Sequence, residues 1–268
     1  MLSKRVISAA IGVALLVSVL ISDKIFVNIG IAIISILALY ELFSATDNMQ
    51  NKLLALVAFL SAGVLAFSNY IGQKSIMAFI YSYVFLLFII LLFNHKSIKV
   101  NSIAFTCFSS IYICYLLSHI VFTRYLPEGK IFIWMIFLGA FMTDTFAFFV
   151  GISMGKHKLC PAISPKKTIE GALGGIIGCG ASFLFFGYLL QTFGKYNINY
   201  GNLFILGLAC SIAAQVGDLS ASVIKRQYDI KDFGQIMPGH GGVLDRFDSI
   251  LFVAPLVYYF TANFNIIG

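Results

Sequence analysis

The chain has 268 residues, of which 60% are hydrophobic and 11% are charged, and its mean hydropathy is +0.94. Soluble domains carry roughly 25% charged residues, so this composition excludes a disordered chain, a disulfide-rich secreted scaffold and an ordinary soluble enzyme. The net charge of +7 is a feature of nucleic-acid-binding proteins, but in so apolar a chain it indicates cytoplasmic loops beside a lipid bilayer. We therefore predict no nucleic-acid partner.

Apolar runs near the length that spans the roughly 30 Å hydrocarbon core of a bilayer occur along the whole chain. The first run follows Lys4–Arg5 and lacks a small-residue cleavage site, so it is a retained helix rather than a signal peptide. The predicted fold class is all-α, a polytopic integral membrane protein with about nine transmembrane helices. The predicted spans are Val6–Ile21, Ile25–Tyr40, Leu53–Phe67, Ser75–Phe93, Ile103–Val121, Ile131–Val150, Ile169–Phe193, Leu203–Val216 and Ser249–Phe264.

Lysine and arginine are distributed unevenly between the loops that alternate along these spans. The side of the N-terminus carries 13 of the 18, and the other side carries five. Because basic loops are retained in the cytoplasm, we predict a cytoplasmic N-terminus and a C-terminus on the opposite side. We expect one transmembrane domain over residues 1–268, with mainly scaffold helices in 1–130 and a catalytic half with motif loops in 131–268.

An acidic residue, Asp144, lies two-thirds of the way along the predicted span Ile131–Val150. A carboxylate at membrane depth is costly and is a functional-site candidate by default. The alternative is a structural hydrogen bond to a neighbouring helix. If Asp144 lies near the cytoplasmic end of its span, it would reach the same site as Asp218.

The loop over residues 160–171 combines hydroxyl and ammonium groups just ahead of an apolar helix. These polar residues are Ser164, Lys166, Lys167 and Thr168. The N-terminus of a helix favours anions, so the loop is a candidate anion site. The alternative is a basic loop that meets lipid headgroups. The glycines that follow, Gly171/Gly175 and Gly174/Gly178, have the spacing of helix packing rather than of chemistry.

Charges concentrate most strongly in residues 218–248, which hold five of the 11 acidic residues. Helical spacing would put Asp218, Ser222 and Lys225 on one face. Asp245 and Asp248 would be neighbours if the last helix begins there. Between these groups, residues 238–242 read Pro-Gly-His-Gly-Gly, and such glycines let backbone N–H groups approach an anion.

Aspartates beside lysines and arginines favour a divalent metal together with phosphate. Mg²⁺ is usually held by one or two carboxylates and by substrate phosphates, and lysine and arginine bind the remaining phosphate oxygens. The alternative is a solvated loop with internal salt bridges. Because these carboxylates flank membrane segments, where unpaired charge is costly, the functional interpretation is favoured.

The stretch from Ser222 to Asp248 resembles the signature of the phosphatidate cytidylyltransferases (CDP-diacylglycerol synthases). The upstream pairs Asp144–Thr145 and Gly217–Asp218 and the segment 164–171 resemble the same family. The matching signature positions are Ser222, Lys225, Arg226, Lys231, Asp232, Pro238, His240, Gly241, Gly242, Asp245, Arg246 and Asp248.

The resemblance implies that the protein transfers a cytidylyl group from CTP to phosphatidate and releases pyrophosphate, with Mg²⁺ as a pair of ions. A phosphomonoester has a second pKa near 6, so the lipid phosphate is close to a dianion at about pH 7. It therefore attacks the α-phosphate of CTP without a strong base. Positioning and charge neutralisation should account for most of the catalysis.

The resemblance also implies roles for individual residues. Metal ligands are expected at Asp218 and Asp245 first, and at Asp144 and Asp248 second. The catalytic candidates are Asp218, Lys225, Arg226, Asp245 and Arg246. The substrate-binding candidates are Ser164, Lys166, Lys167, Thr168, Ser222, Lys231, His240, Gly241 and Gly242.

Two other functions fit parts of the pattern. A CTP-dependent kinase of a polyprenol-type lipid would transfer the γ-phosphate, and an ion-coupled transporter would use Asp144 and Asp218 along an ion path. We expect a multi-pass protein of the bacterial plasma (inner) membrane whose active site faces the cytoplasm, where CTP is found. The family resemblance and the glycine-rich helix are both compatible with a homodimer.

Overall fold

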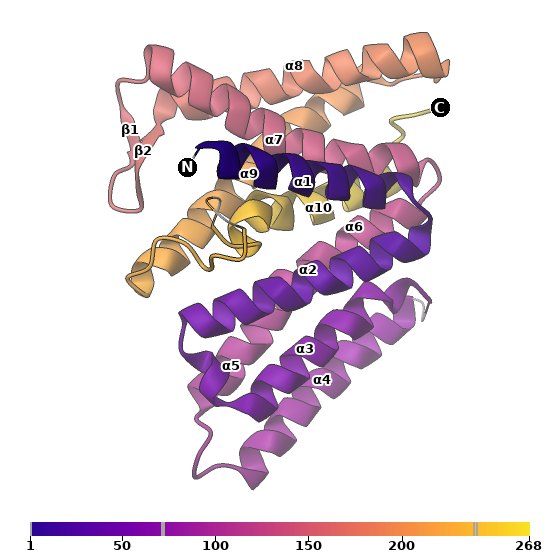
Figure 1. Cartoon of the computed structure of the whole chain (residues 1–268). Helices are drawn as coiled ribbons and strands as arrows, with labels where there is room; N and C mark the ends of the chain where they lie inside the picture. The colour runs from indigo at the N-terminus through magenta and orange to yellow at the C-terminus, as the bar shows by residue number, and fades with distance from the viewer. Residues whose placement is uncertain (1, 71–72, 238, 240) are drawn as a thin grey trace. The chain divides into compact units, whose positions relative to one another are not determined.

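The computed structural model describes residues 2–70, 73–237, 239 and 241–268, and within them the chain is almost entirely helical (Figure 1). The helices are α1 (Leu2–Ile21), α2 (Lys24–Ala45), α3 (Lys52–Ala66), α4 (Gln73–Phe93), α5 (Val100–Ser109), α6 (Leu116–Tyr125), α7 (Gly129–Met154), α8 (Ile169–Gly194), α9 (Tyr200–Gln227) and α10 (Leu244–Asn263). Shorter helical turns are η1 (Asn48–Gln50), η2 (Ser68–Tyr70) and the π-helical η3 (Ser110–Tyr115). The predicted all-α class is confirmed.

One small element was not predicted. Strands β1 (Lys158–Cys160) and β2 (Ser164–Thr168) form an antiparallel hairpin, in which Lys158 pairs with Thr168 and Cys160 with Ser164. The loop predicted over residues 160–171 is therefore mostly an ordered strand that leads directly into α8.

Six helices of the described chain are long and apolar enough to cross a membrane, which makes the chain a multi-pass membrane protein. They are α2, the part of α4 from Ile76, the continuous run of α5, η3 and α6, and α7, α8 and α9. Helix α3 and the part of α1 from Ala10 are apolar but shorter. Every predicted span falls on one of these helices or on α10, whereas the total of nine crossings and the cytoplasmic N-terminus stay predictions.

The predicted span Leu203–Val216 ends too early, because α9 continues to Gln227. Hydropathy falls after Val216, but residues 218–227 contain no glycine and no proline to break the helix. The helix stops where Asp229 adopts the left-handed conformation, with φ of 53°. The charged residues after Val216 are therefore presented on a rigid helix.

The helices form two compact units, each described by itself. The first contains the residues up to Tyr125 together with Ile230–Arg246, and the second contains Leu126–Asp229 together with Phe247–Gly268. In the first unit α2 packs against α3 and α6 (Figure 1). Leu39, Leu42 and Phe43 on α2 are fully buried there.

In the second unit α8 packs between α7 and α9. A Cβ atom on Gly171 would lie 2.7 Å from the carbonyl oxygen of Ala147, and one on Gly175 would lie 3.1 Å from that of Thr143. These contacts confirm the packing role predicted for the glycine spacing, because only glycine permits so close an approach. The glycine face of α8 that contains Gly171 and Gly175 is thus in contact with α7 of the same chain.

Candidate active site

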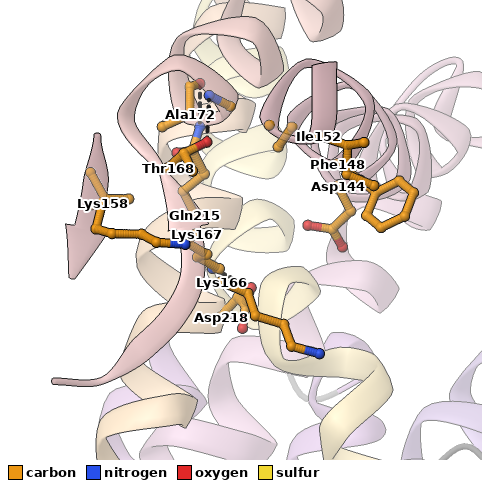
Figure 2. A pocket seen from close by; sticks show the side chains of 14 residues that line it. Asp144, Phe148, Ile152, Lys158, Lys166, Lys167, Thr168, Ala172, Gln215 and Asp218 are labelled. Atoms are coloured by element: carbon orange, nitrogen blue, oxygen red, sulfur yellow. Dashed lines mark hydrogen bonds and ion pairs between the residues drawn. The ribbon is translucent and has the colours of Figure 1, made fainter. Parts of the chain in front are cut away.

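A cavity of about 550 Å³ opens in the second unit between α7, the hairpin, α8 and α9 (Figure 2). Its lining includes predicted site residues from three separate segments of the sequence, namely Asp144, Lys166, Lys167, Thr168 and Asp218. The structure therefore brings together groups that the sequence separates by up to 74 positions. The apolar part of the lining comes from side chains such as Phe148 and Ile152.

The hairpin supplies the basic side of the cavity. Lys158 on β1 and the consecutive Lys166 and Lys167 on β2 all line it. Sequence reasoning missed Lys158, although its position in the same polar segment was a signal that could have identified it. Three ammonium groups around one cavity create a site that attracts polyanions.

The base of the hairpin is anchored by Glu170, in the first turn of α8. Its carboxylate accepts N–H groups from Lys156 at 3.1 Å and from His157 at 3.2 Å, and it lies 2.6 Å from Nδ1 of His157. The Thr168 hydroxyl caps α8 by accepting the N–H of Gly171 at 3.1 Å. These bonds fix the direction in which β2 presents its two lysines.

Asp218 is the acidic centre of this unit. Its half-buried carboxylate forms an ion pair with the Nζ of Lys167, and the buried Ser222 hydroxyl lies 3.5 Å from its Oδ1. Asp218, Ser222 and Lys225 lie on one helix, as the i, i+4, i+7 spacing predicted. The ion pair joins the hairpin to α9 across the cavity (Figure 2).

A second carboxylate lies close to Asp218 because Gly217 lets α10 approach α9. A Cβ atom on Gly217 would be 2.5 Å from the backbone oxygen of Asp248. Asp248 precedes the predicted span of α10 and is buried, and its Oδ1 accepts the N–H of Ser249 at 2.7 Å. Burial raises the pKa of Asp248 to about 7, and the carboxylates of Asp218 and Asp144 contribute to the rise. Three carboxylates therefore influence one another electrostatically in this region.

Other predicted residues of this unit lie around the hairpin and at the end of α9. Ser164 begins β2, opposite Cys160. The Nε of Arg226 donates to the carbonyl oxygen of Ile163 at 3.3 Å, which ties α9 to the turn of the hairpin. The hairpin is thus held at its turn as well as at its base.

The rest of the signature belongs to the first unit and is built around Asp245. Its Oδ2 accepts the N–H of Phe233 at 2.9 Å and that of Gly242 at 3.0 Å. Gly241 has a φ of 84°, which favours glycine, and its carbonyl oxygen accepts the N–H of Met237 at 3.0 Å. These bonds connect Phe233, Met237, Gly241 and Gly242 with the start of α10.

The remaining predicted residues of the first unit are at its surface or undescribed. Lys231 and Arg246 are exposed. His240, a predicted substrate-binding residue, and Pro238, the predicted helix stop, lie outside the described residues. Asp245 follows directly on the start of α10 at Leu244, so the predicted neighbour relation of Asp245 and Asp248 on one helix is confirmed.

One residue next to this loop was not predicted at all. Glu41 of α2 is only 2% exposed, and its two oxygens accept the N–H groups of Val243 and Leu244, both at 2.9 Å. The predicted span Ile25–Tyr40 ended one residue before it. A carboxylate directly after an apolar run was the signal that could have revealed it.

Comparison with known proteins gives one consistent result. A sequence profile described as the cytidylyltransferase family matches residues 3–264. The chain is 34% identical over 260 residues to a phosphatidate cytidylyltransferase of Staphylococcus saprophyticus, covering 94% of this chain and 96% of that protein. It is 32% identical over 254 residues to one of Staphylococcus aureus, with the same coverage. It is 41% identical to one of Bacillus subtilis over 166 residues, which are 62% of this chain and 60% of that protein.

Proposed function

Since the chain belongs to the phosphatidate cytidylyltransferase family, we propose that the cavity of the second unit is its active site. The protein transfers the cytidylyl group of CTP to phosphatidate, giving CDP-diacylglycerol. The observation that carries the site assignment is the cavity whose lining combines Lys158, Lys166 and Lys167 with Asp144 and Asp218. Such a site suits a polyphosphate that arrives with a cation.

The lysines are proposed to bind the phosphates of the two substrates. The triphosphate of CTP is a polyanion and the phosphate of phosphatidate is close to a dianion, so cations are needed to bring them together. Lys166 is exposed and Lys167 is half-buried, so one can meet an incoming ligand while the other is held by Asp218. Lys225, Arg226 and Arg246 are proposed to bind the remaining phosphate oxygens.

The residues also fit Mg²⁺, although no three carboxylate, imidazole or thiolate groups among the described residues form a ready-made metal cage. Mg²⁺ does not need one, because one or two carboxylates usually hold it and water and substrate phosphates complete its octahedron. Asp218 and Asp248, neighbours where α9 meets α10, offer the hard oxygen atoms that this ion prefers. We propose that a pair of Mg²⁺ ions is held by Asp218 and Asp245, with Asp144 and Asp248 contributing. When bound, Mg²⁺ would neutralise triphosphate oxygens and stabilise the leaving pyrophosphate.

The chemical step needs little more from the protein than positioning. An oxygen of the phosphatidate phosphate forms a bond to the α-phosphorus of CTP while the bond from that phosphorus to the bridging oxygen breaks, and pyrophosphate leaves with the electron pair. The attacking group is already anionic at neutral pH, so no side chain has to remove a proton. Lys158, Lys166 and Lys167 are proposed to hold the two substrates in line for this displacement.

The site is proposed to open at the cytoplasmic face of the plasma membrane. The count of basic loop residues puts the hairpin and the glycine-rich loop on the side of the N-terminus. CTP is a cytoplasmic nucleotide, and the headgroup of phosphatidate lies at the bilayer surface. A cavity with a charged wall and apolar side chains such as Phe148 suits a lipid whose headgroup must meet a nucleotide.

Product identification tests the function directly. Purified protein in detergent–lipid micelles would receive phosphatidate, Mg²⁺ and CTP labelled in the cytosine ring. Cytidylyl transfer moves the label into the lipid phase and releases pyrophosphate. A lipid kinase would leave the label in water as CDP, so this result would overturn the proposal in favour of γ-phosphate transfer. Absence of labelled lipid from well-folded protein would overturn it as well.

A further inference from the structure

Glu41 forms side-chain hydrogen bonds with the residues that directly follow the glycine-rich loop. It lies in the apolar helix α2, where a buried carboxylate is costly unless hydrogen bonds compensate it. The compensation comes from the N–H groups of Val243 and Leu244, 202 and 203 residues further along the chain. Because burying a carboxylate in an apolar helix costs free energy, Glu41 is a candidate for a specific structural or functional role.

Glu41 caps the N-terminus of α10. The first N–H groups of a helix have no partner inside the helix, and a carboxylate placed there also interacts favourably with the helix dipole. The residue before α10 is Val243, whose side chain has no oxygen to serve as a cap. Glu41 supplies from α2 the acceptor that the local sequence lacks.

Two glycines of the loop make room for this carboxylate. A Cβ atom on Gly234 or on Gly242 would lie 2.4 Å from an oxygen of Glu41. Gly234 does not have a positive φ, so the close contact with Glu41, and not the backbone conformation, explains why this position is a glycine. The carboxylate cannot simply move aside, because both of its oxygens are engaged.

The carboxylates of Glu41 and Asp245 together accept hydrogen bonds from three consecutive backbone N–H groups. Asp245 accepts the N–H of Gly242, and Glu41 accepts those of Val243 and Leu244. The loop that carries the signature residues is therefore held between a signature carboxylate and one from a helix that contains no signature residue. Losing Glu41 would release two of the three donors.

We propose that Glu41 is a positioning residue for cytidylyl transfer: it fixes Gly242, Val243 and Leu244 and thereby the orientation of Asp245 and Arg246. This proposal depends on the proposed role of Asp245 at the active site. The reacting phosphates are not in contact with Glu41; it acts through the loop. The turnover number, and not only the amount of folded protein, depends on it.

The first experiment compares Glu41→Gln with Asn28→Ala in purified enzyme. Asn28 is a matched control, because it is a fully buried polar residue of the same helix whose amide bonds to Ala66 and Asn69, away from the loop. We expect Glu41→Gln to lower kcat by about 10–100-fold, as for residues that orient metal ligands, and to raise the half-activating Mg²⁺ concentration. Asn28→Ala should lower thermal stability and leave both quantities within about twofold, since it only loosens packing.

Hydrogen exchange gives a readout that does not depend on activity. The peptide over residues 233–247 should exchange faster in Glu41→Gln than in the wild type, because two amides lose their acceptor. The same peptide should be unchanged in Asn28→Ala. A loosened loop with wild-type kcat and Mg²⁺ dependence would overturn the positioning role. A wild-type enzyme that makes no CDP-diacylglycerol would overturn the proposed function instead, while the exchange result would still report on the loop.

Gly234→Ala tests the same contact from the loop side without any change at Glu41, so wild-type kcat in Gly234→Ala would overturn the proposal even if Glu41→Gln fails to fold. A double-mutant cycle extends this test. Gly234→Ala should lower kcat roughly tenfold in the wild type but have little effect in Glu41→Ala, where the colliding carboxylate is absent. Gly63→Ala in α3 is the matched control, because nothing lies within 4 Å of its added methyl group. Equal effects of Gly234→Ala in both backgrounds would show that the loop glycine does not accommodate Glu41, which would overturn the proposal.

Discussion

Glu41 and Asp144 are acidic residues inside long apolar helices of this protein, and they have opposite surroundings. Glu41 on α2 is buried in the first unit, where both of its carboxylate oxygens accept backbone N–H groups. Asp144 on α7 is exposed in the second unit, where it lines a cavity. Backbone N–H groups compensate the burial of the Glu41 carboxylate, whereas the Asp144 carboxylate lines a cavity that a ligand can enter.

The comparison teaches how to interpret an acidic residue in a membrane helix. A carboxylate whose acceptors are filled by the backbone acts on the conformation of the protein. A carboxylate that faces a cavity acts on ligands. The two therefore differ in how they respond to metal ions, to substrate and to conservative substitution, and the predictions below use these differences.

The largest effect is expected from removing divalent cations. If the cavity carboxylates act through Mg²⁺, chelation with EDTA should reduce labelled CDP-diacylglycerol to background, and added Mg²⁺ should restore it. The measurement is the transfer of labelled cytidylyl groups into lipid. Full activity in excess EDTA would contradict the metal proposal.

Asp218→Asn should have the next largest effect. It keeps the shape of the side chain but removes the charge that meets Lys167, so kcat should fall by about 10²–10³-fold, the range for losing one preorganised electrostatic group. Asp47→Asn is a matched control, because Asp47 is exposed and its left-handed backbone suits asparagine. Wild-type kcat in well-folded Asp218→Asn would exclude a metal-binding role for this residue.

Asp144→Asn should have a smaller effect on kcat, of roughly tenfold, because Asp144 is proposed only as a contributing ligand. If Asp144 acts on ligands in the cavity that it lines, the thermal unfolding temperature of Asp144→Asn should not fall. Calorimetry alongside the transfer assay measures both. A lowered unfolding temperature with normal kcat would favour the structural alternative for Asp144.

The smallest effect is expected at Thr168. Thr168→Ala removes the oxygen that caps α8 and should lower the free energy of unfolding by about 1 kcal/mol. Thr168→Ser keeps the hydroxyl and should restore the stability. Chemical denaturation of the purified variants would measure this difference, and equal stability of Thr168→Ala and the wild type would contradict the capping role.

The helices could be predicted from the sequence because each of them satisfies a local rule. The length of each apolar run predicts most helix ends within a few residues. Where polar residues follow the apolar run, as after Val216, the predicted end comes before the true end of the helix. The hairpin was not predicted because its strands, three and five residues long, are too short to show a period. Its order comes from tertiary contacts such as those of Glu170.

The candidate site could be predicted only in part. Asp144, Lys167 and Asp218 were predicted from their charge next to apolar segments, and the structure brings them to one cavity. The position of Glu41 directly after an apolar run was a signal in the sequence, but its role could not be predicted because its partners lie more than 200 positions away. Lys158 was missed because antiparallel pairing, and not spacing, carries it beside Thr168.

The long separation between Glu41 and its partners has a consequence for biosynthesis. Ribosomes add about 5–20 residues per second, so roughly 10–40 s pass between the synthesis of Glu41 and that of Val243, 202 positions later. During that interval α2 is made with an acidic group whose acceptor sites have no backbone donors yet. The first unit reaches its final form only after Val243 and Leu244 have been synthesised, and truncation before residue 243 would leave this carboxylate without these backbone donors.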